Sequence, residues 1–118
     1  MRLLFTLLLL AFIASCSKQV VLDEKQINRI EIEAMEILIE VPEPKFDFDY
    51  SVKATIVSLT PKNVYITKEG LYIVIDSGFS SESGFFVSRK GLAVDTTSGQ
   101  DPLYKKLSNN LYQYEIKG

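Results

Sequence analysis

The side chains best suited to gripping a polar ligand are concentrated in one segment, DSGFSSESG, at residues 76–84. Ser80, Ser81 and Glu82 lie in it, and Arg89 follows shortly after. Hydroxyls and a carboxylate can hold a polar ligand, and a guanidinium can pair with an anion. These four residues therefore form a candidate ligand or partner site. An ordinary connection between two strands needs the same small polar residues and is the alternative.

Two other segments carry oxygen atoms of the kind that calcium binds. Asp47 and Asp49 alternate with aromatic residues in FDFDY, and residues 95–101, DTTSGQD, add more oxygens and Gly99. Calcium takes about 6–8 oxygen ligands, which calcium loops supply at set spacings around a glycine turn. Neither segment has that spacing, so we predict no metal site and no cofactor.

The residue types that the chain lacks exclude most common catalytic designs. The chain of 118 residues has no histidine and one cysteine. A Ser-His-Asp triad, a Cys-His pair and histidine metal ligands are thereby excluded, and no glycine-rich phosphate loop occurs. We predict that the protein is not an enzyme. A hydrolase using two carboxylates is the least favoured alternative, because so short a chain has few residues to form the walls of an active-site cleft between them.

The single cysteine follows an apolar run that begins after Arg2. The uncharged stretch 3–15 is shorter than the roughly 20 residues of a membrane-spanning helix, so it predicts a signal peptide. Ile13-Ala14-Ser15-Cys16 resembles the bacterial lipobox, with an aliphatic residue, two small residues and then cysteine. The resemblance implies lipid attachment to Cys16 and cleavage before it. Because Ser17 follows rather than aspartate, it also implies sorting to the outer membrane.

This interpretation divides the chain into a lipoprotein signal peptide at 1–15, a short tether at 16–25 and one globular domain at 26–118. We expect the domain to face the periplasm, held to the membrane by the lipid on Cys16. A lone thiol offers no intrachain disulfide.

Charge is distributed unevenly along the chain. Residues 23–49 hold nine acidic and three basic residues, whereas residues 50–118 hold six and eight. Glu33, Glu36 and Glu40 form a candidate acidic face for an envelope protein partner, which such a charge would attract. A merely solvated helix face is the alternative. The mild overall acidity argues against nucleic acid as a partner.

Four tyrosines lie in the expected strands: Tyr65, Tyr72, Tyr112 and Tyr114. Exposed on one face, they would form a stacking platform for a sugar or a peptide. Cross-strand aromatic pairs that only stabilise the sheet explain them equally well.

The secondary structure that positions these residues is predicted to be helical in the first half of the domain and a β-sheet in the second half. Residues 26–41 place apolar side chains at helical spacing, although they also alternate as a strand with one phase slip. Residues 51–59 predict a short helix. Strands are expected at 64–67, 71–75, 84–88 and 111–116, with 92–95 extending the sheet. Lys68-Glu69-Gly70 predicts a hairpin loop with positive φ at the glycine, and Asp101-Pro102 predicts a helical turn to residue 107.

The predicted fold class is therefore α+β, with an N-terminal helix or helices packed on a small antiparallel sheet of about four to five strands. The stretches LTPKNVYITKEGLYIVIDSGF and LYQYEIKG resemble small uncharacterised bacterial proteins. That resemblance implies a fold and no activity. We predict a non-catalytic binding domain. An immunity or inhibitor lipoprotein that blocks a periplasmic or cell-wall-active enzyme is the alternative.

Overall fold

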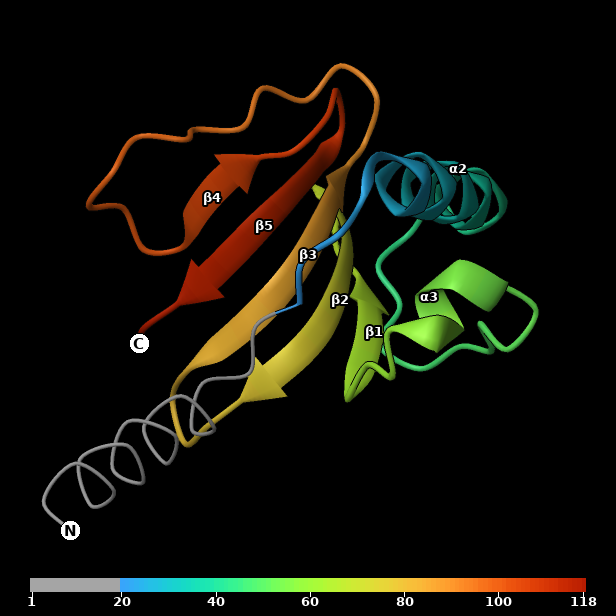
Figure 1. The fold of residues 1–118 in the computed structure, drawn as a ribbon, viewed down its shortest axis with the longest axis horizontal. Coiled ribbons are helices and arrows are strands. Elements are labelled where there is room, and N and C mark those ends of the chain that lie inside the picture. The colour runs from blue at the N-terminus through green and yellow to red at the C-terminus, as the bar shows by residue number, and fades with distance from the viewer. Residues whose placement is uncertain (1–19) are drawn as a thin grey trace, which may run out of the picture.

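The computed structural model describes residues 20–118, so the signal peptide and Cys16 lie outside the described residues. The elements in chain order are α2 (Glu24–Glu40), α3 (Ala54–Ser58), β1 (Asn63–Ile66), β2 (Gly70–Ser77), β3 (Glu82–Ser88), β4 (Leu103–Lys106) and β5 (Leu111–Ile116). Both helices lie on one side of a single sheet (Figure 1). The α+β prediction is confirmed.

The sheet is open and wholly antiparallel, with strand order β1-β2-β3-β5-β4. Short connections join β1 to β2, β2 to β3 and β4 to β5. The connection after β3 is longer, because the chain passes beyond the position of β5 to reach the edge strand β4. The two ends of β3 therefore lie in different surroundings, one at the β2–β3 hairpin and the other near α2.

The helix α2 forms where the apolar spacing predicts it. Its N-terminus is closed by a capping box, in which the Asp23 carboxylate accepts the N–H of Gln26 and the Gln26 side chain accepts the N–H of Asp23. The buried face consists of Ile30, Ala34, Ile37 and Leu38. The strand alternative is wrong for this segment. The short helix expected within 51–59 is confirmed by α3.

The two faces of the sheet carry different side chains. On the helix side, the core is almost entirely aliphatic: Ile30, Ala34, Ile37, Leu38, Ile56, Leu59, Val64, Ile66, Leu71, Ile73, Ile75, Phe85, Val87 and Leu111. On the other side, Tyr72, Phe86, Tyr112 and Tyr114 are buried together, and Tyr65, Val94, Tyr104 and Ile116 pack against them. We call this second group the aromatic cluster. Alternation along each strand separates the two groups.

Two expectations for the segment between β3 and β5 are wrong. Residues 92–95 form no strand, and residues 103–106 form β4 rather than a helical turn. The Asp101 carboxylate does not cap a helix, because it accepts the N–H groups of Lys117 and Gly118 at 2.9 and 3.1 Å. Pro102 directly precedes an edge strand, a position that tolerates a missing N–H.

Gly70 is needed for a reason other than the expected one. It is the first residue of β2, and it is not among the glycines with positive φ. A Cβ at this position would lie 2.1 Å from the carbonyl oxygen of Val87. Glycine is therefore required because β2 and β3 approach each other closely here.

Candidate functional site

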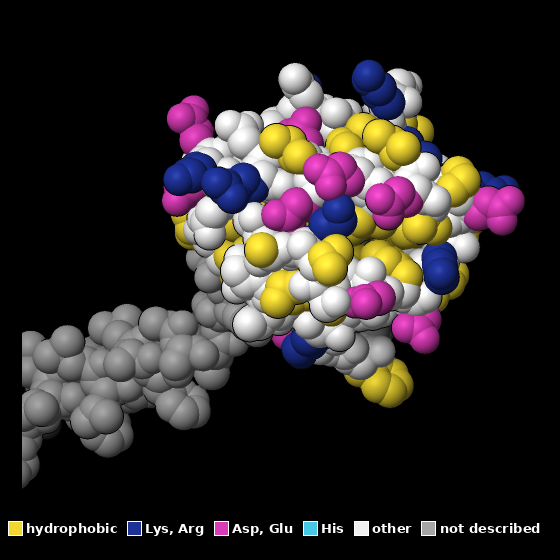
Figure 2. All heavy atoms as spheres, turned by 90° about the vertical axis from the view of Figure 1, so that its right-hand side faces the viewer, with side chains coloured by type: hydrophobic (Ala, Val, Ile, Leu, Met, Phe, Trp, Pro, Cys, Tyr) yellow, Lys and Arg dark blue, Asp and Glu magenta, His cyan; other side chains and the backbone are white. Residues whose placement is uncertain are grey.

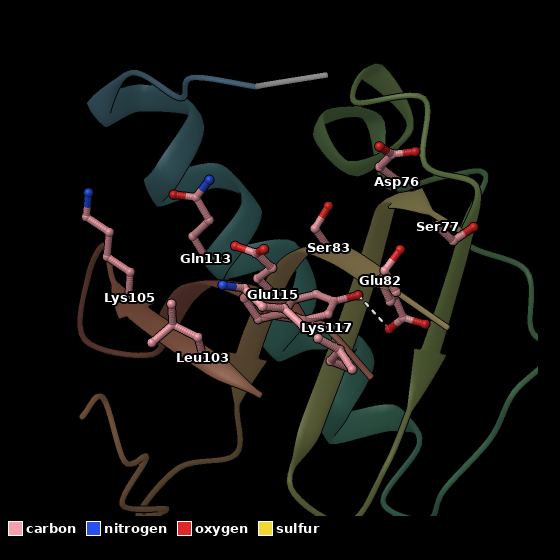
Figure 3. Close-up of a pocket in the computed structure, with 12 residues that line it drawn as sticks. Asp76, Ser77, Glu82, Ser83, Leu103, Lys105, Gln113, Glu115 and Lys117 are labelled. Atoms are coloured by element: carbon pink, nitrogen blue, oxygen red, sulfur yellow. Dashed lines mark hydrogen bonds between the residues drawn. The ribbon is translucent and has the colours of Figure 1, made fainter. Parts of the chain in front are cut away.

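Only part of the candidate ligand site at residues 80–82 lies in the loop that connects β2 and β3. Ser80 and Ser81 lie in the connection, but Glu82 is the first residue of β3. The Oε2 atom of Glu82 accepts hydrogen bonds from the hydroxyls of Tyr65 at 2.6 Å and Tyr114 at 2.8 Å, the latter drawn in Figure 3. One oxygen of this carboxylate is thus engaged in holding two strands of the aromatic cluster together.

Arg89 lies at the other end of β3 and does not join this group. It donates to the carbonyl oxygens of Lys68 at 3.0 Å, Thr67 at 3.1 Å and Leu38 at 3.5 Å. A strand of this length separates it from Glu82 by roughly 20 Å. The structure therefore does not bring Arg89 together with Ser80, Ser81 and Glu82. Arg89 instead fastens the β1–β2 turn to the end of α2.

A shallow pocket of about 580 Å³ lies at the hairpin end of the sheet (Figure 3). Its lining residues are Asp76, Ser77, Ser81, Glu82, Ser83, Leu103, Lys105, Gln113, Tyr114, Glu115, Ile116 and Lys117. Its charges are mixed, and Asp76 is paired with Lys62 at 3.2 Å. Hydroxyls, an amide and both signs of charge allow it to hold a polar ligand.

Two of the three glutamates of the candidate acidic face make contacts within the domain. The Glu33 carboxylate accepts the N–H groups of Thr55 and Ile56 at 3.1 Å, at the start of α3. Glu36 forms an ion pair with Lys53 at 2.7 Å, and this hydrogen bond raises the pKa of the Lys53 ammonium. These carboxylates attach α3 to α2. Glu40, in the last turn of α2, is exposed.

A groove of about 690 Å³ runs beside α2, toward the β4–β5 turn. It is lined by Asn28, Glu31, Ile32, Met35, Glu36, Ile39, Ser108 and Asn109, and we call it the α2 groove. The Glu31 carboxylate accepts hydrogen bonds from the Ser108 hydroxyl and the Asn110 amide, so the turn is held against the helix. Figure 2 shows apolar and acidic side chains interspersed on this side of the molecule.

The apolar residues of the α2 groove are the part of the site that the sequence analysis missed. Ile32 and Ile39 are 58% and 78% exposed, and Met35 between them is half-buried. Their spacing of three and four residues is helical and marks a second apolar stripe on α2. The helical spacing given above for residues 26–41 covers only the buried face of α2, and Ile32, Met35 and Ile39 fit the alternating strand pattern that was the alternative.

The tyrosines do not form an open stacking platform. Tyr72, Tyr112 and Tyr114 are buried. Tyr65 stacks on Tyr72 with ring centroids 5.0 Å apart, and the hydroxyls of Tyr72 and Tyr104 lie 2.6 Å apart. Burial raises the pKa of Tyr65, Tyr72, Tyr104 and Tyr114, and the hydrogen bonds to Glu82 add to the rise for Tyr65 and Tyr114. The rings stabilise the sheet.

The candidate calcium segments make local turn contacts. Asp49 accepts the N–H of Ser51 at 2.9 Å, and Asp95 accepts the N–H of Thr97 at 2.9 Å and its hydroxyl at 2.5 Å. Hydrogen bonding to Ser51 and Thr97, respectively, lowers the pKa of each carboxyl. Within residues 20–118, no three acidic, histidine or cysteine side chains are grouped so as to hold a metal ion.

No protein-family model matches the chain, and neither a curated protein nor a solved structure matches it significantly. None of the helices within the described part of the chain is long and apolar enough to span a membrane. The site must therefore be interpreted from its own geometry.

Proposed function

We propose that the protein is a lipoprotein of the bacterial cell envelope, anchored in the outer membrane through Cys16, whose domain is non-catalytic and binds an envelope protein through the α2 groove. The lipobox-like Ile13–Cys16 segment supports the anchor. The pocket at the hairpin end is lined by residues of mixed charge, which suit the binding of a polar ligand.

The observation that carries the binding proposal is the exposed apolar stripe of the α2 groove. The core already has its own stripe on α2, so Ile32 and Ile39 are not needed to hold the helix on the sheet. Burying one such side chain is worth about 1.5–3 kcal/mol. A partner that covers the groove would gain this free energy.

The charge around the stripe specifies the partner's chemistry. Glu31 and Glu36 line the groove, Glu36 also pairing with Lys53, and the exposed Glu40 follows Ile39 in the last turn of α2. A complementary partner presents apolar side chains flanked by lysine or arginine, as an amphipathic basic segment does. Its basic residues would meet these carboxylates at the polar rim of the interface, while its apolar residues cover Ile32, Met35 and Ile39.

Site-specific photo-crosslinking in intact cells tests this. A photo-reactive residue at position 39 lies in the groove, whereas one at position 46 replaces Phe46, which is also exposed but stacks on Tyr65 of the aromatic cluster, on the face of the sheet opposite α2. We expect one envelope protein to crosslink to position 39 through a basic, apolar segment. Adding Ile32→Lys should abolish this product, because it places a positive charge against a basic partner. Equal yields from both positions, or yields unchanged by Ile32→Lys, would contradict the proposal.

The anchor is tested separately by Cys16→Ser. Without the thiol no lipid can attach, so fatty-acid labelling should disappear and the chain should remain uncleaved or become soluble. Membrane partitioning of the wild-type chain without any incorporated lipid would count against the lipoprotein interpretation.

A further inference from the structure

Phe79 stands at the tip of the β2–β3 hairpin and contacts almost nothing. Its relative exposure is 109%, more than in an extended reference peptide. Its ring does not pack on the core. The connection is a tight turn, closed by the hydrogen bond from the N–H of Gly78 to the carbonyl oxygen of Ser81 at 2.9 Å. Such a turn accounts for the glycine and the serines, but it does not require an aromatic residue.

The turn residues next to Phe79 are uncharged, namely Gly78, Ser80 and Ser81, and the nearest charged residues along the chain, Asp76 and Glu82, lie in the paired strands β2 and β3. By contrast, Phe46, the other exposed phenylalanine among residues 20–118, stacks on Tyr65 with ring centroids 5.6 Å apart. An isolated aromatic side chain on an uncharged projection can enter an apolar medium without taking a charge out of water. The tip thus has the chemistry of a small membrane-inserting loop.

The position of the tip agrees with the proposed anchor. Arg89 and Leu38 mark the α2 end of β3, and the hairpin tip is at the opposite end. The first described segment, drawn in blue, passes in front of β3 on its way to α2 (Figure 1), and the described residues begin at 20. Cys16 precedes Val20 by four residues, a link that spans at most about 14 Å. A lipid on Cys16 therefore keeps the start of the domain, at residue 20, close to the membrane surface.

We propose that Phe79 inserts into the membrane interface as a second contact beside the lipid anchor, and that this orients the domain with the α2 groove directed away from the membrane. The proposal rests on lipid attachment at Cys16. A single aromatic side chain binds too weakly to hold the protein at a membrane, but once the lipid confines the domain it suffices to select an orientation.

The chain has no tryptophan, so a substitution at the tip gives a fluorescent reporter without background. The test uses the full lipidated chain carrying Phe79→Trp, reconstituted in vesicles of phosphatidylethanolamine and phosphatidylglycerol. We expect blue-shifted emission and loss of most of its intensity when the lipid acyl chains are brominated. Phe46→Trp is the matched control, because Phe46 is 67% exposed and the adjacent Lys45 bridges to Ile66, near the β1–β2 turn that Arg89 fastens to α2. Its emission should stay unquenched.

Three results would overturn the proposal, and they are distinguishable. If the chain floats with the vesicles but Phe79→Trp emits like the Phe46→Trp control, the tip does not insert. If Phe79→Trp is blue-shifted in native envelopes but not in protein-free vesicles, a protein covers the tip instead of lipid. If the purified chain carries no lipid and does not float, the anchor itself is wrong, and the proposed function fails with it.

Discussion

On the helix-covered face of the sheet the buried side chains are aliphatic except for Phe85, whereas on the opposite face they are aromatic and mostly tyrosine. The first face is covered by α2 and α3. No helix formed by residues 20–118 covers the second (Figure 1), and its rings bury one another. Phe85 and Phe86 are adjacent in β3, yet each belongs to a different face.

The difference lies in what each face requires for stability. An aliphatic core needs only volume and shape, because it contains no polar atoms to satisfy. A tyrosine whose hydroxyl is buried must find a hydrogen-bond partner for it. Tyr65 and Tyr114 find theirs in Glu82, and Tyr72 and Tyr104 find theirs in each other. Within the described residues, no buried side-chain nitrogen or oxygen lacks a partner. The aromatic face is therefore sensitive to single polar changes that would not affect the other.

The largest expected effect is common to both faces. Phe85→Ala and Phe86→Ala should each lower the free energy of unfolding by about 3–5 kcal/mol, because both rings are almost fully buried. Urea unfolding measures this. Phe79→Ala is the matched control and should change stability by less than about 0.5 kcal/mol. A small loss for Phe86→Ala alone would show that the aromatic face is not a packed core.

Removing the acceptor at the edge of the aromatic cluster should have the next largest effect. Glu82→Ala leaves two phenols without their partner, at about 1–3 kcal/mol for each hydroxyl that stays buried and unpaired. Glu115→Ala, on the exposed side of β5, should cost little. Combining Glu82→Ala with Tyr65→Phe should recover part of the loss, since both partners of one bond are then gone. Strict additivity of the two variants would contradict the assigned bond.

Alkaline pH should destabilise the protein through the aromatic face. Burial raises the pKa of Tyr65, Tyr72 and Tyr114 above the ordinary value of about 10. Above that value the unfolded chain releases phenolic protons that the folded chain retains, so the free energy of unfolding falls as pH rises. Below about pH 10 these groups contribute no pH dependence. Thermal unfolding across the alkaline range, with Tyr72→Phe expected to flatten the decline, measures this. A melting temperature constant through that range would contradict it.

The sequence predicted the parts of the fold that local periodicity determines. The buried stripe of α2, the short α3 and the alternating strands before residue 90 all follow from side-chain spacing. The prediction of a helical turn at 101–107 was wrong, because Asp-Pro is only a local helix-start pattern. The observed β4 depends on pairing with β5 and on Asp101 accepting the N–H groups of residues 117 and 118. Such contacts between distant residues leave no mark in a local pattern.

The candidate site was less predictable for a related reason. Arg89 is close to Glu82 in sequence, but an extended strand moves the chain about 3.3 Å per residue and carries the two apart. The spacing of Ile32, Met35 and Ile39 was visible, yet whether another element covers them is a property of the whole fold. Phe79 likewise has the sequence context of a loop residue that packs inward, and only the geometry of the tight turn shows that it points outward.

The smallest expected effect on the free energy of unfolding distinguishes the contribution of aromatic ring contacts from that of buried apolar area. Phe86 packs against Tyr72, Tyr104 and Tyr112 with ring centroids 4.5, 5.3 and 6.2 Å away, while Phe85 lies among aliphatic side chains. Phe86→Leu should therefore cost about 1 kcal/mol more than Phe85→Leu, the amount that an aromatic pair adds beyond its buried area. Urea unfolding of the two variants side by side measures the difference. Equal losses would mean that the rings contribute only their area, and the two faces of the sheet would then differ in their hydroxyls alone.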